Sequence, residues 1–178
     1  MMGEWKKMVT IRDVPAEVRW ALATKAANDF SFTYPAAVRS IVGEMFDAEL
    51  SAMETQMWAG FGKEQATLAK GFGFPLRTAR HVADAFSTLS VLLQGPEIDN
   101  GEVRDGPGDS AIITIEACPM LKRAKSMGIT GDAVLQGCRA YTQSSVSSLN
   151  PDYEVSFNRS MCRGDAACEM QVNRARPL

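Results

Sequence analysis

The C-terminal part of the chain carries the pattern that most restricts its fold. Residues 111–118, AIITIEAC, are rich in β-branched side chains that alternate between two faces, which is typical of a strand. Residues 153–160 and 167–173 show the same alternation, and residues 161–165 between them read as a turn. A helix over residues 132–148, capped by Thr130, and a short helix or loop over residues 120–127 separate the first strand from the other two. Strands joined by so short a turn predict an antiparallel sheet.

The residues before this sheet predict helices. Pro15 and Glu17 suit the first turn of a helix that runs to about residue 28, and residues 29–33 are expected to form a turn. A longer helix opens at Tyr34-Pro35 and ends at residues 60–62, Gly-Phe-Gly. Helices over residues 63–69 and 76–93 follow, and residues 95–108 are expected to form a loop. The sequence therefore predicts an α+β fold, with a helical N-terminal half packed on a C-terminal antiparallel β-sheet that has one inserted helix.

Composition narrows the classes of partner. A net charge of −2 gives no general attraction to nucleic acid or to anionic membranes. The longest apolar runs fall far short of the ~20 residues that span a bilayer, and the first residues lack the apolar segment of a signal peptide. We therefore expect a cytoplasmic protein without a membrane partner, in which cysteines are kept reduced.

The N-terminal segment resembles a second kind of module. Residues 7–12, KMVTIR, alternate as a short strand, and with the helices that follow they resemble a ribbon-helix-helix DNA-binding module. In that family Thr10 and Arg12 would enter a major groove from a dimeric ribbon. Residues 1–33 are then a strand–helix extension, residues 34–173 the main α+β domain and residues 174–178 a tail. Residues 1–43 carry six Lys or Arg against four Asp or Glu, so DNA is a partner that the sequence permits but does not favour.

All four cysteines of the chain lie within the sheet-forming part, at Cys118, Cys138, Cys162 and Cys168. Their spacing lacks the paired CxxC motifs of a zinc ribbon. Cys118 ends a strand, Cys138 faces inward from a helix and the last two flank a hairpin turn, so the thiols could converge at one end of the sheet. Four thiolates would close a structural zinc site or hold an iron–sulfur cluster, and three would leave a position open for water. Packing thiols and a single reactive thiol remain alternatives to a metal.

Two carboxylates lie next to these cysteines. Glu116 shares a strand face with Cys118 between isoleucines, where partial burial would raise the pKa of its carboxyl group. Asp165 follows Gly164 in the hairpin turn, where its side chain can bond nearby backbone N–H groups or act as a general base. Glu116 and Asp165 are therefore candidates for proton transfer.

Residues 137–172, with the CPM segment at 118–120, resemble the C-terminal half of the L-2-amino-thiazoline-4-carboxylate hydrolase-like family. They are similar, more distantly, to the vinyl-reductase-type small-molecule-binding domains of bacterial phenol sensors. The resemblance runs from about residue 34 to residue 172, and its most specific part is the hairpin Cys-x-Gly-Asp-x-x-Cys. The sensor resemblance implies zinc on Cys138, Cys162 and Cys168. Arg159 stands where the sensors have a glutamate, and Cys118 would replace that ligand.

The hydrolase resemblance implies that water opens a cyclic amidine at the carbon between nitrogen and sulfur. This reaction needs a metal-bound hydroxide or a thiolate as nucleophile, and an acid for the leaving nitrogen. We assign the nucleophile to Cys118 or to a cysteine-held metal, and the proton transfers to Glu116 or Asp165. We therefore expect a homodimeric hydrolase that acts on a C–N bond of a small heterocycle. The alternative is a non-catalytic small-molecule-binding or sensor domain with a cysteine-held metal, linked to DNA through its N-terminal module.

Overall fold

A four-stranded antiparallel sheet forms one layer of the molecule. The computed structural model describes residues 10–98 and 101–175. Strands β1 (Glu102–Asp105), β2 (Ser110–Ile115), β3 (Tyr153–Arg159) and β4 (Cys168–Arg174) are arranged in the order β1-β2-β4-β3. The three expected strands are confirmed as β2, β3 and β4. Strand β1 lies in the segment expected to be a loop, and it pairs antiparallel with β2.

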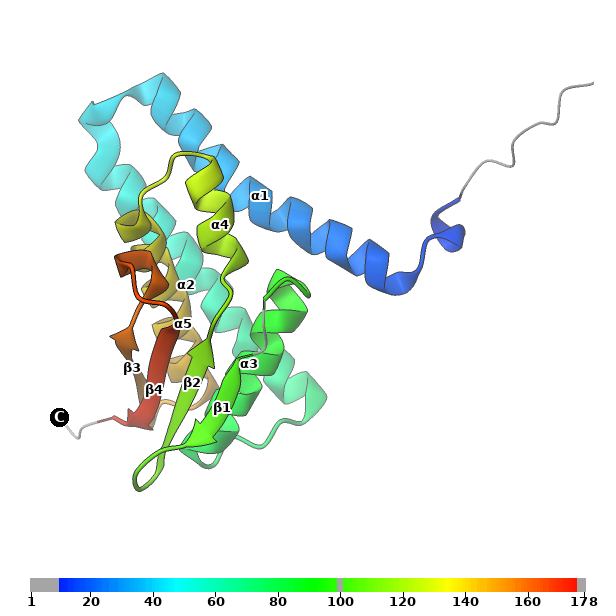
Figure 1. Cartoon of the computed structure of the whole chain (residues 1–178), viewed down its shortest axis with the longest axis vertical. Helices are drawn as coiled ribbons and strands as arrows, with labels where there is room; N and C mark the ends of the chain where they lie inside the picture. Colours follow the sequence, from blue (N-terminus) through cyan, green and yellow to red (C-terminus); the bar gives the residue numbers. More distant parts are fainter. Residues whose placement is uncertain (1–9, 99–100, 176–178) are drawn as a thin grey trace, which may run out of the picture.

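Three helices, α2 (Asp47–Phe72), α3 (Ala79–Gln94) and α5 (Gly131–Leu149), pack with the sheet around the main core (Figure 1). Alternate residues of the strands point to them, so that Ile113 pairs with Met170 and Ala111 pairs with Val172 on the buried face. The short helix α4 (Pro119–Ser126) and α5 both lie between β2 and β3 in the chain. The α+β architecture, with a helical N-terminal half and a C-terminal antiparallel sheet, is therefore confirmed.

The N-terminal helices differ from the prediction. Helix α1 (Ala16–Val42) is continuous through residues 29–33, where a turn was expected, and it passes through Pro35. The break comes later, at Gly43 and the 3-10 turn η2 (Glu44–Phe46). Gly43 has φ +71°, a conformation that glycine adopts at little cost, and its N–H caps the carbonyl of Arg39. Helix α2 then runs without interruption through residues 60–62, where we expected a helix to end.

The expected N-terminal strand is partly outside the described residues. Residues 7–9 fall there, while Ile11–Asp13 form a 3-10 turn (η1) in place of the end of a strand. The boundary between residues 33 and 34 falls inside α1. Within the described part of the chain, the two short helices of a ribbon-helix-helix module are replaced by this one long helix.

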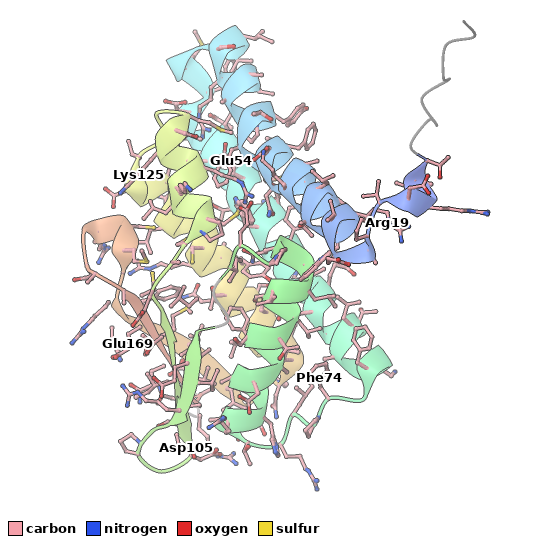
Figure 2. All side chains as sticks on the ribbon, turned by 45° about the vertical axis from the view of Figure 1, so that its right-hand side comes forward. Arg19, Glu54, Phe74, Asp105, Lys125 and Glu169 are labelled. Carbon is pink, nitrogen blue, oxygen red and sulfur yellow. The ribbon has the colours of Figure 1, made fainter. Side chains whose placement is uncertain are left out.

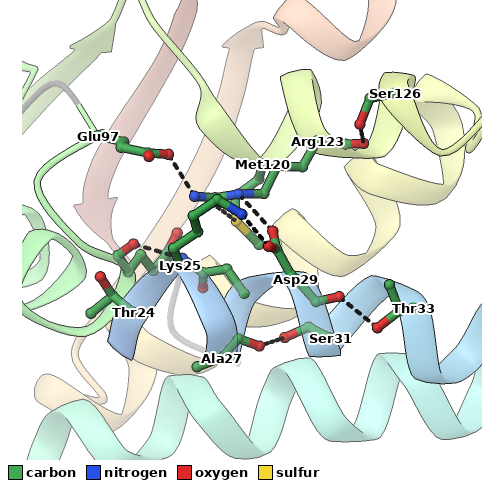
Figure 3. A network of polar contacts seen from close by, with 12 residues as sticks. Thr24, Lys25, Ala27, Asp29, Ser31, Thr33, Glu97, Met120, Arg123 and Ser126 are labelled. Atoms are coloured by element: carbon green, nitrogen blue, oxygen red, sulfur yellow. Dashed lines mark hydrogen bonds and ion pairs between the residues drawn. The ribbon is translucent and has the colours of Figure 1, made fainter. Parts of the chain in front are cut away.

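Helix α1 crosses the other helices, and its N-terminal end extends beyond them (Figure 1). Side chains of its N-terminal half attach it to neighbouring elements. Trp20 Nε1 donates to the Leu92 carbonyl at 3.0 Å, and Asn28 Nδ2 donates to the Gln94 carbonyl at 2.6 Å. Arg123 of α4 lies between two carboxylates (Figure 3). Its Nε is 3.1 Å from Asp29 Oδ1 of α1, and its Nη2 is 2.5 Å from Glu97 Oε2. These contacts hold α1 over the end of α3 and beside α4.

No helix in residues 10–98 or 101–175 combines the length and apolar content that crossing a bilayer requires.

Candidate functional site

A cavity of about 550 Å³ lies among the helices α1, α2, α3, α4 and α5 and the end of the sheet. Its size is within the range of small-molecule pockets, which are about 300–1,000 Å³. The walls are mostly apolar, and their large side chains include Phe32, Trp58, Phe86, Ile113, Val134 and Met170. These six residues come from six different elements, so the cavity exists only in the folded chain.

All four cysteines line this cavity. Cys118 is the N-cap of α4, and its Sγ accepts a hydrogen bond from the Leu121 N–H at 3.4 Å. Cys168 opens β4, and its Sγ accepts from the Met161 N–H at 3.3 Å. Cys138 lies on α5, with its Sγ 4.0 Å from Thr142 Oγ1. Cys162 lies in the 3-10 turn η3 (Met161–Arg163) of the hairpin.

A glycine brings the hairpin against the start of α5. A Cβ atom at Gly131 would lie 2.2 Å from the carbonyl oxygen of Cys162, which is far closer than two such atoms can approach. Gly131 is the first residue of α5, and only the missing side chain lets the helix begin against η3. This contact places Cys162 beside the helix that carries Cys138.

The environment of three thiols, those of Cys138, Cys162 and Cys168, favours their neutral form. Burial is the main cause that raises the pKa of Cys138 to about 12, and proximity to Cys118 and Cys168 adds to it. Burial likewise raises the pKa of Cys162 to about 11, and it raises the pKa of Cys168. Since the thiolate is the nucleophile and the metal ligand, these three side chains are poorly activated for either role near neutral pH.

The four thiols share a cavity without forming a metal site. In the part of the chain that the structure describes, no group of three or more His, Cys, Asp or Glu side chains is arranged to hold a metal ion. The residues as placed therefore do not fit tetrahedral zinc or an iron–sulfur cluster, both of which need thiolates grouped around one point. All four cysteines are free. Zinc or iron–sulfur binding stays a prediction, and the metal content of the purified protein tests it.

The two candidate carboxylates lie outside the cavity lining. Glu116 follows the end of β2 and is exposed. Asp165 is also exposed, and its Oδ2 accepts a hydrogen bond from the Ser160 N–H at 2.6 Å. This bond closes the hairpin turn, in which Gly164 has φ +99°. Of the three residues predicted to be catalytic, Cys118 lines the cavity, and Glu116 and Asp165 do not.

A polar cluster that the sequence did not reveal lies at the interior end of the cavity. Tyr141 Oη accepts from Gln65 Nε2 at 2.5 Å and lies 3.2 Å from Ser90 Oγ. Burial raises the pKa of Tyr141, so its hydroxyl stays protonated. Tyr141, Ser90 and Gln94 line the cavity. The sequence offers one indication of this cluster. Ser90 is polar but follows Phe86 by four residues, so it lies on the apolar face of α3.

A charged group lies at the other, more open end. Arg39 of α1 makes a two-point ion pair with Glu54 of α2, in which Nη2 lies 3.0 Å from Oε2. Its Nε lies 3.4 Å from Asp47 Oδ1. Side-chain exposures of 34% for Arg39 and 56% for Asp47 show that this end reaches solvent. Figure 2 labels Glu54 where α1 crosses the other helices. We call Arg39, Asp47 and Glu54 the rim cluster.

Comparison with known proteins supports the fold. No protein-family model matches the chain, and neither does any curated protein. Among solved structures, the chain is similar to subunit 3 of the trafficking protein particle complex from Naegleria fowleri, in a crystal structure with covalently bound palmitic acid. The TM-score is 0.57 with 13% sequence identity, over 86% of this chain and 98% of that one. At this identity the similarity shows a shared fold.

Proposed function

We propose that this chain is a small-molecule-binding domain whose ligand occupies the thiol-lined cavity. The observation that carries the proposal is the cavity itself, which combines about 550 Å³ of space with apolar walls and a few polar groups at its two ends. An apolar cavity of this size gains free energy when a ligand removes its walls from water, by roughly 25 cal/mol per Å² of apolar surface. The polar clusters at its ends can orient a ligand that has a hydrogen-bonding group.

The chemistry of the cavity supports binding more strongly than catalysis. A hydrolase needs an activated nucleophile and a proton donor close to the same reacting atom. Three of the four thiols have raised pKa values, and Glu116 and Asp165 lie outside the lining. Opening of a cyclic amidine stays a prediction centred on Cys118. The prediction is tested by measuring hydrolysis of a cyclic amidine. The wild type should turn the substrate over, and Cys118→Ser should not.

The structural neighbour suggests the shape of a suitable ligand. The crystallised subunit of the trafficking complex holds palmitic acid covalently. For this chain we propose a ligand with an extended apolar part, held without a covalent bond to Cys138, Cys162 or Cys168, because their raised pKa values keep these thiols neutral.

The exposed side of α1 supports the homodimer that we expected. Its large apolar side chains include Leu22, Phe30, Tyr34 and Ile41, of which Phe30 is 64% exposed and Ile41 83% exposed. Phe30 lies near the middle of this stripe, so two antiparallel copies of α1 would place apolar residues opposite one another along its length. We propose a second copy of the chain as the partner. Sedimentation should give a dimer for the wild type and a monomer for Phe30→Glu, and a monomeric wild type would contradict the proposal.

Titration with a neutral fluorescent dye, N-phenyl-naphthylamine, tests binding in the cavity. Ala36 and Ala37 are neighbouring exposed residues of α1, and only Ala36 lines the cavity. We expect saturable binding by the wild type and by Ala37→Trp, and loss of most binding in Ala36→Trp, because the indole obstructs the opening. Melting temperatures show whether both variants are folded. Equal binding by the two variants would contradict a ligand in this cavity.

A further inference from the structure

We infer that the cavity selects ligands whose polar group is cationic or uncharged and discriminates against free carboxylates. This inference rests on the proposed function and adds the class of ligand. The chemical class is an amphiphile with an apolar body and an ammonium, amine or hydroxyl group.

The charges at the open end carry the inference. Among the described residues that line the cavity, the Lys, Arg, Asp and Glu side chains are one cation, Arg39, and two carboxylates, Asp47 and Glu54. The rim cluster therefore has a formal charge of −1, from one positive and two negative groups. A ligand carboxylate at this end would meet net repulsion, and an ammonium group would meet net attraction.

Every nitrogen of the Arg39 guanidinium already contacts a side chain of the protein. Both terminal nitrogens of its guanidinium face Glu54, Nε lies 3.4 Å from Asp47, and Nη2 also lies 3.4 Å from Ser51 Oγ. A ligand carboxylate would have to compete with a two-point ion pair for this cation. Breaking such a pair leaves Glu54, whose side chain is only 20% exposed, without its partner.

The start of α5 does not supply a competing anion site. Thr130 and Ala133 line the cavity near the opening, and a helix N-terminus generally favours negative charge. Here Thr130 Oγ1 accepts from the Ala133 N–H at 3.4 Å, and Asp132 supplies a carboxylate in the first turn. The Thr130 side chain thus satisfies one backbone donor of this helix end, and the Asp132 carboxylate offsets the positive end of the helix dipole.

The interior end is polar but uncharged. Tyr141, Ser90 and Gln94 present hydroxyl and amide groups to the cavity. These groups can donate to or accept from a hydroxyl or amine. A carboxylate placed here would lose its hydration without meeting a cation, which is costly in a buried environment. The interior end therefore favours an uncharged polar group and the open end a cationic one, and neither end favours a carboxylate.

Displacement of the bound dye by three ligands of equal chain length tests the inference. Decylamine, decanol and decanoate differ in the charge of one terminal group at neutral pH. We expect decanol to bind about three- to tenfold more tightly than decanoate, and decylamine at least as tightly as decanol. Raising the salt concentration should narrow the differences, because exposed charges are screened. Decanoate binding as tightly as decanol would overturn the inference while leaving the proposed function intact.

A double variant locates the cause. Glu54→Gln with Asp47→Asn removes both carboxylates and leaves Arg39 free to pair with a ligand, so decanoate should then bind at least as tightly as decanol. Glu154→Gln removes an exposed carboxylate of β3 that does not line the cavity, and it should leave the order unchanged. An unchanged order in the double variant would overturn the role of the rim cluster. Failure of the dye and all three ligands to bind the wild type would overturn the proposed function itself.

Discussion

Arg39 of α1 and Glu54 of α2 form a two-point ion pair across the open end of the cavity, with Nη2 3.0 Å from Oε2. The Glu54 side chain is 20% exposed, whereas that of Asp47, the other partner of Arg39, is 56% exposed. The pair links the long N-terminal helix α1 to α2. It therefore contributes both to the attachment of α1 and to the charge that a ligand meets.

Glu54→Gln should lower the free energy of unfolding by about 1 kcal/mol, because it removes a charge-assisted pair that is partly shielded from water. Asp47→Asn should change it by less than about 0.5 kcal/mol, since that contact is longer and more exposed. Urea denaturation of the two variants measures the difference. Equal losses would show that Arg39 does not distinguish the two carboxylates.

Two of the half-buried thiols, those of Cys138 and Cys162, should differ in reactivity. Cys138, with a pKa raised to about 12, holds a smaller thiolate fraction than Cys162, with a pKa raised to about 11. Iodoacetamide should therefore modify Cys138 more slowly than Cys162 in the folded protein, and at similar rates in urea. Peptide mapping by mass spectrometry at successive times measures both rates. Faster modification of Cys138 in the folded state would contradict its placement.

Gly62 should tolerate no side chain, although Gly60 in the same helix should. A Cβ at Gly62 would lie 2.4 Å from the Tyr141 carbonyl oxygen of α5, and a Cβ at Gly60 meets nothing within 4 Å. Gly62→Ala should destabilise the protein by about 1–3 kcal/mol through overpacking. Gly60→Ala should stabilise it by up to about 1 kcal/mol through helix propensity. Thermal unfolding compares the two, and similar melting temperatures would contradict the close packing of α2 on α5.

Asp109 should make stability depend on acid pH. Its carboxylate accepts from the Ala79 N–H at 2.9 Å, from Tyr153 Oη at 2.7 Å and from Arg174 Nε at 3.0 Å. These contacts, led by the Ala79 N–H, lower the pKa of Asp109 below its ordinary 3.8. The stabilisation is therefore present above pH 3.8 and is lost as the pH falls through the lower folded-state value.

Asp109→Asn should reduce stability at neutral pH and flatten its decline in acid. Asp105→Asn is the matched control, because the Asp105 side chain is 77% exposed and its contact with Arg80 is 3.7 Å long. Urea midpoints at several pH values measure both variants. Parallel acid profiles for Asp109→Asn and the wild type would show that the carboxylate is not linked to folding.

The sequence predicted the fold class because its local patterns agree with the final packing. The strand expected over residues 111–118 becomes β2, which ends earlier, at Ile115, so that Cys118 caps α4 and does not end a strand. The expected helix after Thr130 becomes α5. The helix break was misplaced because local propensity competes with tertiary contacts. Residues 29–33 were expected to form a turn before a helix that opens at Tyr34-Pro35, but the buried residues Asn28 and Phe32 hold α1 together there.

Other features depend on contacts between residues far apart in the chain. Strand β1 has only one half-buried residue among four, so no alternation marks it, and its pairing with β2 defines it. The cavity is lined from elements that span most of the sequence. The cysteines and their placement near one end of the sheet could be predicted from strand and helix periodicity. Two pairings at the ends of the cavity, that of Arg39 with Glu54 and that of Tyr141 with Gln65, could not be predicted in this way.

Contact quenching of Trp58 by a brominated decanol tests ligand binding in the cavity most directly. Trp58 lines the cavity, whereas Trp20 donates to the Leu92 carbonyl and does not line it. A variant with Trp58 alone combines Trp5→Phe and Trp20→Phe, and its counterpart with Trp20 alone combines Trp5→Phe and Trp58→Phe. We predict saturable quenching of Trp58 and none of Trp20 beyond that of free indole. A ligand in this cavity would be contradicted if Trp20 were quenched and Trp58 were not, or if neither tryptophan were quenched.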